Sequence, residues 1–158
     1  MHPGLSVLDV GTGTGVLARI ARARGASLVH ATDIDTEALN AARANAKLDA
    51  SENKIIFSEN LPDHWGASFD LVIANILENP LRSLRSNLAG ALKSGGFLLL
   101  SGFTPLQTPL LRTAFEQTEL NYVSDAVLDN WALLMLQKKL VISHFMIGSA
   151  HDGAFHPP

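Results

Sequence analysis

The sequence lacks cysteine, long apolar runs and any block of charges of one sign. The lack of cysteine excludes disulfides and thiolate metal sites, and we predict no metal site of another kind. The net charge of −3 argues against the wide phosphate-binding surface that duplex nucleic acid requires, so we expect no nucleic acid partner. The longest apolar runs, such as FLLL at 97–100, fall far short of the roughly 20 residues that span a membrane.

The first residues, MHPGLSVLDV, have neither the basic end nor the long apolar centre of a signal peptide. We therefore expect a cytoplasmic protein without membrane association. Hydrophobic residues make up 47% of the 158 residues and charged residues 17%, which is typical of one globular domain with a substantial core.

Apolar runs of strand length alternate with segments of helical period, a pattern that indicates an α/β fold with a parallel sheet. The expected strands occupy residues 5–10, 27–33, 54–58, 69–75 and 97–102, and the expected helices occupy residues 16–25, 36–48, 80–92 and a stretch from Pro105 or Thr108 to about Thr118. Two further strand-like runs, 120–128 and 131–139, are separated only by Asp129 and Asn130. So short a connection joins antiparallel strands.

Several local features refine this arrangement. In helix 16–25 we expect Leu17, Ile20 and Ala21 to face the core. Asp35 or Thr36 caps the second helix, Asn79 with Pro80 caps the third, and KSGG at 93–96 forms a turn. The tail from 140 to 158 contains turn formers without a clear period, and we expect it to be poorly ordered.

Between the first strand and the first helix, three glycines follow one another at every second position in VLDVGTGTGVL, residues 7–17. Glycine permits positive φ angles and lets a ligand approach the backbone closely. The N–H groups at the start of the following helix favour a carboxylate or phosphate. Gly11, Gly13 and Gly15 are therefore expected to form the floor of a site for a ligand with an anionic end.

Two acids narrow the choice of ligand. Asp33 ends the second strand, where a carboxylate can accept both hydroxyls of a ribose without a 2′-phosphate. Asp9 precedes the glycines and can take an amino group directly or through water. A ribose on one acid and a zwitterionic end on the other describe S-adenosyl-L-methionine, and the G-x-G-x-G spacing differs from the G-x-G-x-x-G of dinucleotide folds.

The sequence resembles the class I S-adenosylmethionine-dependent methyltransferases, and within them the catalytic domain of the PrmA-type ribosomal-protein methyltransferases. The resemblance rests on VLDVGTGTGVLA (7–18), ATDIDTEAL (31–39), FDLVIANILENPL (69–81), LKSGGFLLLSG (92–102) and DNWALLML (129–136). It implies a Rossmann-like three-layer sandwich with a seven-stranded, mostly parallel sheet of order 3-2-1-4-5-7-6 and an antiparallel C-terminal hairpin.

The resemblance also implies roles for single residues. Ile34 packs on adenine beside the ribose-binding Asp33, and Asn60 and Leu61 border the base. Asn75, at the end of the fourth strand, lies beside the transferable methyl group and the acceptor nitrogen. The methionine end of the cofactor is held by Asp9, Gly11, Thr12, Gly13 and Gly15.

Relatives of this type carry an N-terminal docking domain and a GTG-x-H-x-TT segment ahead of the first strand, whereas this chain begins four residues before that strand. We expect residues 1–139 to form the S-adenosylmethionine-binding domain without those parts. The expected reaction is methyl transfer to an amine, a lysine or N-terminal amine of a large-subunit ribosomal protein. Methylation of another protein or a small molecule, and cofactor binding without turnover, remain alternatives.

A nicotinamide-dependent oxidoreductase is the rival from another class. The glycine spacing and the single tyrosine, Tyr122, which has no lysine four positions on, argue against it. Glu78 is the one acid near Asn75 in sequence and a candidate proton acceptor, with water as the alternative. Trp131 and Trp65 are interpreted as packing residues.

Overall fold

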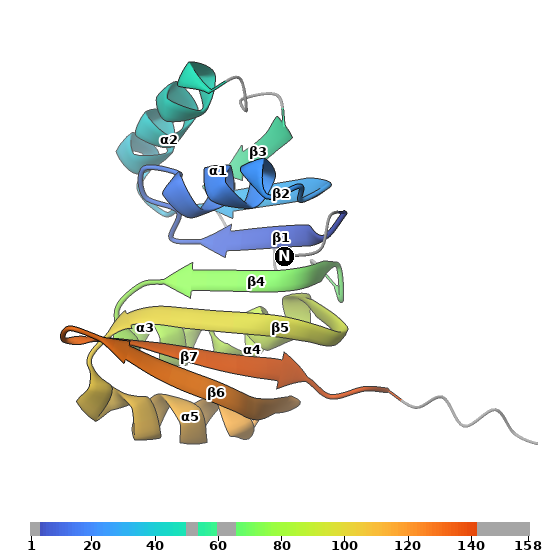
Figure 1. Ribbon diagram of the computed structural model, residues 1–158, viewed down its shortest axis with the longest axis vertical. Coiled ribbons are helices and arrows are strands. Elements are labelled where there is room, and N and C mark those ends of the chain that lie inside the picture. The colour runs from blue at the N-terminus through green and yellow to red at the C-terminus, as the bar shows by residue number, and fades with distance from the viewer. Residues whose placement is uncertain (1–3, 50–53, 60–65, 142–158) are drawn as a thin grey trace, which may run out of the picture.

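The computed structural model describes residues 4–49, 54–59 and 66–141, and Asn60, Leu61, Trp65 and residues 142–158 of the tail lie outside this part. Seven strands form one sheet, with β7 antiparallel to both β5 and β6 (Figure 1). The strand order β3-β2-β1-β4-β5-β7-β6 confirms the expected fold. The strands are β1 Ser6–Val10, β2 Leu28–Thr32, β3 Ile55–Ser58, β4 Phe69–Asn75, β5 Leu92–Phe103, β6 Leu120–Leu128 and β7 Trp131–Lys138.

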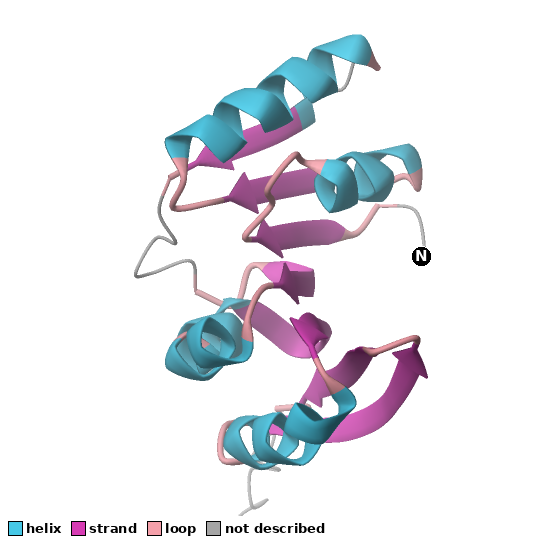
Figure 2. Cartoon of the chain, turned by 90° about the vertical axis from the view of Figure 1, so that its left-hand side faces the viewer, coloured by secondary structure: helices cyan, strands magenta, loops and turns pink. Residues whose placement is uncertain are grey.

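Helices lie on both sides of the sheet, as the turned view in Figure 2 shows. Side chains of α1 and α2 pack on one face and those of α3, α4 and α5 on the other. The helices are α1 Val16–Ala23, α2 Thr36–Leu48, α3 Glu78–Ser83, α4 Arg85–Ala91 and α5 Thr108–Glu116. A 3-10 turn, Pro105–Gln107, leads into α5, and Thr104 and Gln107 cap it reciprocally, so the fourth helical segment begins at Pro105.

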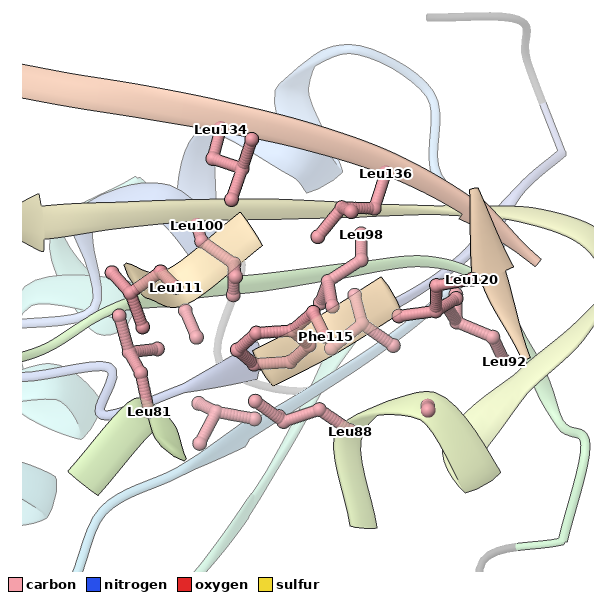
Figure 3. Packing of buried hydrophobic residues seen from close by; sticks show 14 of the residues in the cluster. Leu81, Leu88, Leu92, Leu98, Leu100, Leu111, Phe115, Leu120, Leu134 and Leu136 are labelled. Atoms are coloured by element: carbon pink, nitrogen blue, oxygen red, sulfur yellow. The ribbon is translucent and has the colours of Figure 1, made fainter. Parts of the chain in front are cut away.

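The larger core cluster lies between the sheet and the helices α3, α4 and α5. Phe115 of α5 lies among the leucines of β5, β7 and the neighbouring helices (Figure 3). The smaller cluster joins Val7, Val29 and Ile55 of the sheet to small side chains of α1 and α2, including Ala18 and Ala46. These alanines allow the two helices to approach the sheet closely.

Four local predictions differ from the structure. Ile20 is 49% exposed, whereas Ala21 is buried as expected and Ala18 is the other buried residue of α1. The expected helix 80–92 is two helices separated at Leu84, where ψ is 1°. Leu77, and not Asn79, is the N-terminal cap residue of α3. The KSGG segment is a bulge within β5, because pairing with β4 passes from Leu92 directly to Phe97.

The cap of α2 is settled in favour of Asp35, whose carboxylate accepts a hydrogen bond of 2.8 Å from the Glu37 amide. The hairpin of β6 and β7 turns at Asp129, which has a positive φ of 52°, and places Leu128 opposite Trp131. Asp35 was one of the two caps that the sequence offered, and the two-residue connection at 129–130 joins antiparallel strands as expected.

One part of the sheet has no helix in front of it among the described residues. In Figure 1, α1 lies before β1 and β2, whereas β5, β7 and β6 are open on that side. Phe97 and Leu133 are accordingly 39% and 38% exposed. None of the helices in the described ranges is both long and apolar enough to cross a membrane.

The topology gathers the predicted site at one edge. β1, β2 and β4 are parallel neighbours, so Asp9 near the end of β1, Asp33 after β2 and Asn75 at the end of β4 lie at the same end of the sheet. The chain order reverses between β1 and β4, which is where open α/β sheets bind ligands at the carboxyl ends of strands.

We expect Leu111→Ala to lower the free energy of unfolding by about 2–5 kcal/mol, because Leu111 is fully buried in the larger cluster. Leu110→Ala is the matched control, since its neighbour on the same helix is 49% exposed and should change stability by less than about 1 kcal/mol. Urea denaturation measures both variants. Equal losses would show that this cluster does not carry the fold.

Candidate functional site

A buried carboxylate organises the loop after β1. Asp9 is 1% exposed, and its Oδ2 accepts hydrogen bonds from the Thr12 hydroxyl at 2.6 Å and the Ala18 amide at 3.0 Å. These two contacts tie the loop to the first turn of α1. The other oxygen, Oδ1, is buried and has no hydrogen-bond partner within the described residues. A buried acceptor without a partner is costly, so this atom suits a cationic or N–H donor from a ligand.

Burial also changes the proton affinity of this group. Removal from water raises the pKa of Asp9 to about 6, and the nearby negative charge of Asp33 adds to the rise. The hydrogen bonds from Thr12 and Ala18 act in the opposite direction without cancelling it. A positive group placed next to Oδ1 would restore the carboxylate.

Most amides of the glycine loop donate hydrogen bonds within the protein. The Gly11 and Thr12 amides both donate to the Thr32 carbonyl, at 2.8 and 2.9 Å, and the Gly15 amide donates to the Thr12 carbonyl. These N–H groups are therefore not free for an anion. In the described structure, no acceptor serves the amides of Thr14, Val16 and Leu17, at the start of α1, where the helix dipole also favours negative charge.

Asp33 links the second strand to the glycine loop. Its Oδ2 accepts the Gly13 amide at 2.8 Å and its Oδ1 accepts the Asp35 amide at 3.1 Å. Each carboxylate oxygen keeps one further acceptor position. The carboxylate is thus held in place by the loop while it can still receive two hydroxyl donors.

Ile76, directly after β4, lies between two glycines. A Cβ on Gly11 would come within 2.2 Å of Cγ2 of Ile76, and a Cβ on Gly102 would come within 2.6 Å of the Ile76 carbonyl oxygen. Both glycines also have positive φ, 70° and 91°. Only glycine fits at these two positions. Ile76 therefore packs directly against the backbone at the ends of β1 and β5, a contact that we call the Ile76 clamp.

Two cavities adjoin at this clamp. The first, of about 470 Å³, lies on the side of Asp33 and has mainly apolar walls. Ile34, which is 94% exposed to solvent, borders it. Its lining residues are Val10, Gly11, Thr32, Asp33, Ile34, Glu59, Ile76, Leu77, Pro80 and Leu84.

The second cavity, of about 430 Å³, contains Asn75, and among the described residues it shares only Ile76 and Leu77 with the lining of the first. Its other walls come from the end of β5, at Ser101 and Gly102, and from Trp131 at the start of β7. The two cavities therefore lie on either side of the short segment that contains Ile76 and Leu77, and each is large enough for part of a ligand.

The structure brings most of the predicted site residues together. Gly11, Thr12, Gly13 and Gly15 belong to one loop, Asp9 near the end of β1 accepts a hydrogen bond from Thr12, and Asp33 accepts one from Gly13. The Thr12 hydroxyl is committed to Asp9. Glu78 forms a 3.1 Å ion pair with Arg82 and lines neither cavity. No group of three His, Asp or Glu side chains suited to a metal ion occurs in residues 4–49, 54–59 and 66–141.

Sequence reasoning missed several lining residues. Ile76 and Leu77 belong to the quoted ILENP segment, but nothing in their type marks them as a boundary between two cavities. Trp131 was interpreted as a packing residue, whereas it is 57% exposed and lines the second cavity. Its position directly after a two-residue turn at the sheet edge was the available signal.

Three features together are typical of the class I S-adenosylmethionine-dependent methyltransferases. They are the order of the strands in the sheet, the glycine loop that follows Asp9, and the second acid, Asp33, which contacts that loop. A magnesium protoporphyrin IX methyltransferase from Synechocystis PCC 6803, crystallised with bound S-adenosylmethionine, has this fold, with a TM-score of 0.70 at 23% identity over 87% of this chain and 71% of that one. The cofactor of the class is S-adenosyl-L-methionine.

A narrower relationship follows from sequence. The model of the ribosomal protein L11 methyltransferase (PrmA) family matches residues 1–139, and this chain belongs to that family. The ribosomal protein L11 methyltransferase of Caulobacter sp. (strain K31) is 36% identical over 135 residues, which cover 84% of this chain and 47% of that protein. The ribosomal protein L11 methylase of Lactobacillus delbrueckii subsp. bulgaricus has a TM-score of 0.82 at 35% identity, over 88% of this chain and 72% of that one.

The chain thus spans less than half the length of the Caulobacter relative. The residues present nevertheless fit the cofactor of the class. The unpaired Oδ1 of Asp9 suits its amino group, the first amides of α1 suit its carboxylate, and Asp33 suits its ribose.

We expect Gly13→Ala to weaken binding of S-adenosylhomocysteine at least tenfold. The added methyl group would occupy open space beside Asp33, where we expect the ligand to bind. Gly4→Ala is the matched control, since Gly4 also has a positive φ and open space around it but lies away from the site. Titration calorimetry measures both. If the two variants bind equally well, the loop does not contact the ligand.

The affinity for S-adenosylhomocysteine should depend on pH through Asp9. In the free protein Asp9 holds a proton below about pH 6, whereas the amino group of the ligand requires the carboxylate. Binding therefore releases a proton below pH 6, and affinity should fall about fivefold as the pH drops from 6 to 5. Calorimetry from pH 5 to 8 tests this expectation. Asp9→Asn should bind weakly and without this slope, and an identical slope in the variant would exclude Asp9 as its source.

Proposed function

We propose that this chain binds S-adenosyl-L-methionine at the carboxyl edge of its sheet and transfers the methyl group to an amine of a protein in the cytoplasm. The observation that carries the proposal is the pair of adjoining cavities, one beside the acid–glycine loop and one beside Asn75. When bound, the cofactor supplies an electrophilic methyl group on a sulfonium.

Residues of the first cavity would hold the nucleoside. Asp33 accepts the two ribose hydroxyls with its remaining lone pairs, and the Gly13 amide keeps this carboxylate in position. Ile34, Pro80 and Leu84 offer apolar contact to the base. Asp9 takes the amino group at Oδ1, which requires a small displacement of the chain that now closes this atom off from water.

Asn75 would position the acceptor. It is exposed at the end of β4 and lines the second cavity, so its side-chain carbonyl can accept a hydrogen bond from an amine N–H and orient the nitrogen lone pair. Alignment of this kind is the main source of rate in a displacement reaction that needs no covalent catalyst.

A lysine acceptor must also lose a proton. With an ordinary pKa near 10.4, the neutral amine costs about 4–5 kcal/mol at pH 7. The apolar walls of the second cavity would lower this cost, because burial disfavours the ammonium form. Since Glu78 is paired with Arg82, the proton leaves to water and not to this acid.

We infer the protein substrate from the names of the relatives. Relatives named ribosomal protein L11 methyltransferase support a large-subunit ribosomal protein, with a lysine or N-terminal amine as the acceptor. Residues 1–139, which the family model matches, would form the cofactor-binding domain. Because the curated relatives are longer, parts outside this chain would contribute to choosing the substrate.

Transfer of a tritiated methyl group to a ribosomal-protein mixture tests the proposed function. We expect incorporation into a protein amine, and Asn75→Ala should lower kcat/KM for the acceptor about 10- to 100-fold through loss of alignment. Asn79→Ala is the matched control, because this exposed asparagine lies four residues on and lines neither cavity.

The assay is run with the chain alone and with the N-terminal portion of the Caulobacter relative supplied. Incorporation only in the second case would assign substrate docking to that portion. Binding of S-adenosylhomocysteine without incorporation in either case would overturn methyl transfer and favour a protein that holds the cofactor without turnover.

A further inference from the structure

The indole of Trp131 is more exposed than its place in the sheet requires. Trp131 begins β7 and is 57% exposed, whereas Ala132, Leu134 and Leu136 of the same strand are buried in the larger core cluster. A tryptophan contributes to folding mainly through buried area, so this side chain contributes little to the core. Its exposed surface borders the cavity that contains Asn75.

The backbone around Trp131 is held firmly in place. The hydroxyl of Ser101 donates to the Ala132 carbonyl at 2.9 Å, which fastens the start of β7 to the end of β5. Ala132 also pairs with Phe103, and the turn before Trp131 is a short one at Asp129. The indole therefore projects from a fixed strand end, at the edge of the sheet where β1 and β4 also terminate (Figure 1).

The cavity itself is suited to a slender side chain. It holds about 430 Å³, and the side chains that line it carry no charge. Asn75 offers one polar contact, and Ile76 and Leu77 separate this cavity from the one beside Asp33. An acceptor in this cavity would lie within reach of both the indole and Asn75, which are among its lining residues.

We propose that Trp131 is the residue that recognises the acceptor, by covering the aliphatic chain and the cationic nitrogen of an amine with its indole face. This inference rests on the proposed function. The face of an indole attracts ammonium groups, and it does so more strongly than the rings of tyrosine or phenylalanine. The apolar methylenes of a lysine side chain gain contact with the same surface.

The proposal predicts which kinetic constant of the methyl transfer depends on Trp131. The acceptor nitrogen is positive when the amine arrives, loses its proton to water before transfer, and becomes positive again as the methyl group passes to it from sulfur. The indole face therefore stabilises the arriving ammonium and the transition state to a similar extent, whereas the neutral amine keeps only the apolar contact of its methylenes. Interactions of this uniform kind lower KM and leave kcat nearly unchanged.

Steady-state kinetics with the acceptor protein gives the first test. Trp131→Ala should raise KM for the acceptor about 5- to 30-fold with kcat within threefold, and Trp131→Phe should keep KM within about threefold of the original. Leu133→Ala, on the same strand but outside both cavities, should leave both constants unchanged. A loss confined to kcat would overturn the proposal.

A binding test needs no acceptor protein and no turnover. The chain has two tryptophans, so Trp65→Phe leaves Trp131 as the sole source of indole fluorescence. Choline and its neutral analogue 3,3-dimethyl-1-butanol have the same shape and differ in charge. Choline should quench this fluorescence at concentrations about 3- to 10-fold lower than the alcohol. Equal quenching by both compounds would exclude recognition of a cation.

The two hypotheses can fail separately. Titration with S-adenosylhomocysteine reports cofactor binding without involving Trp131, and choline quenching is read with and without that compound. Cofactor binding together with equal quenching by both probes rejects the role of Trp131 alone. Absence of cofactor binding rejects the proposed function, whatever the quenching shows.

Discussion

The site depends on one buried acid. Asp9 lies at the end of the central strand with one oxygen committed to the loop and to α1, and the other without a partner. The folded chain bears the cost of this arrangement, because a carboxylate in a dry place without full hydrogen bonding is unfavourable. Strain of this sort persists where the rest of the fold enforces it. Here the two neighbouring strands, β2 and β4, and the hydrogen bonds from Thr12 and Ala18 hold the carboxylate in its buried position.

The rigid core explains why so short a chain can hold such a site. The larger cluster fixes β4, β5 and β7 relative to one another, and their ends carry Asn75, Gly102 and Trp131. The smaller cluster fixes β1 and β2, whose ends carry the acids. Ile76 packs closely against Gly11 after β1 and Gly102 of β5, so this residue, which lines both cavities, connects the two halves of the sheet.

Much of this arrangement could be read from the sequence, since strand lengths, the two-residue turn before Trp131 and the position of Asp33 depend on local patterns. The helix break at Leu84 and the exposure of Ile20 could not, because both depend on which neighbouring side chains fill the core. The placement of Asn75 followed from topology. The use of the Gly11 and Thr12 amides by Thr32 is a tertiary contact, and the glycine pattern alone suggests the opposite.

The division between the cavities separates two kinds of specificity along the chain. Val10 to Glu59 supply the acid side, Ser101 to Trp131 supply most of the far side, and within the described residues only Ile76 and Leu77 line both. Substitutions at Ser101, Gly102 or Trp131 would therefore alter the cavity beside Asn75 without changing a residue that lines the cavity beside Asp33.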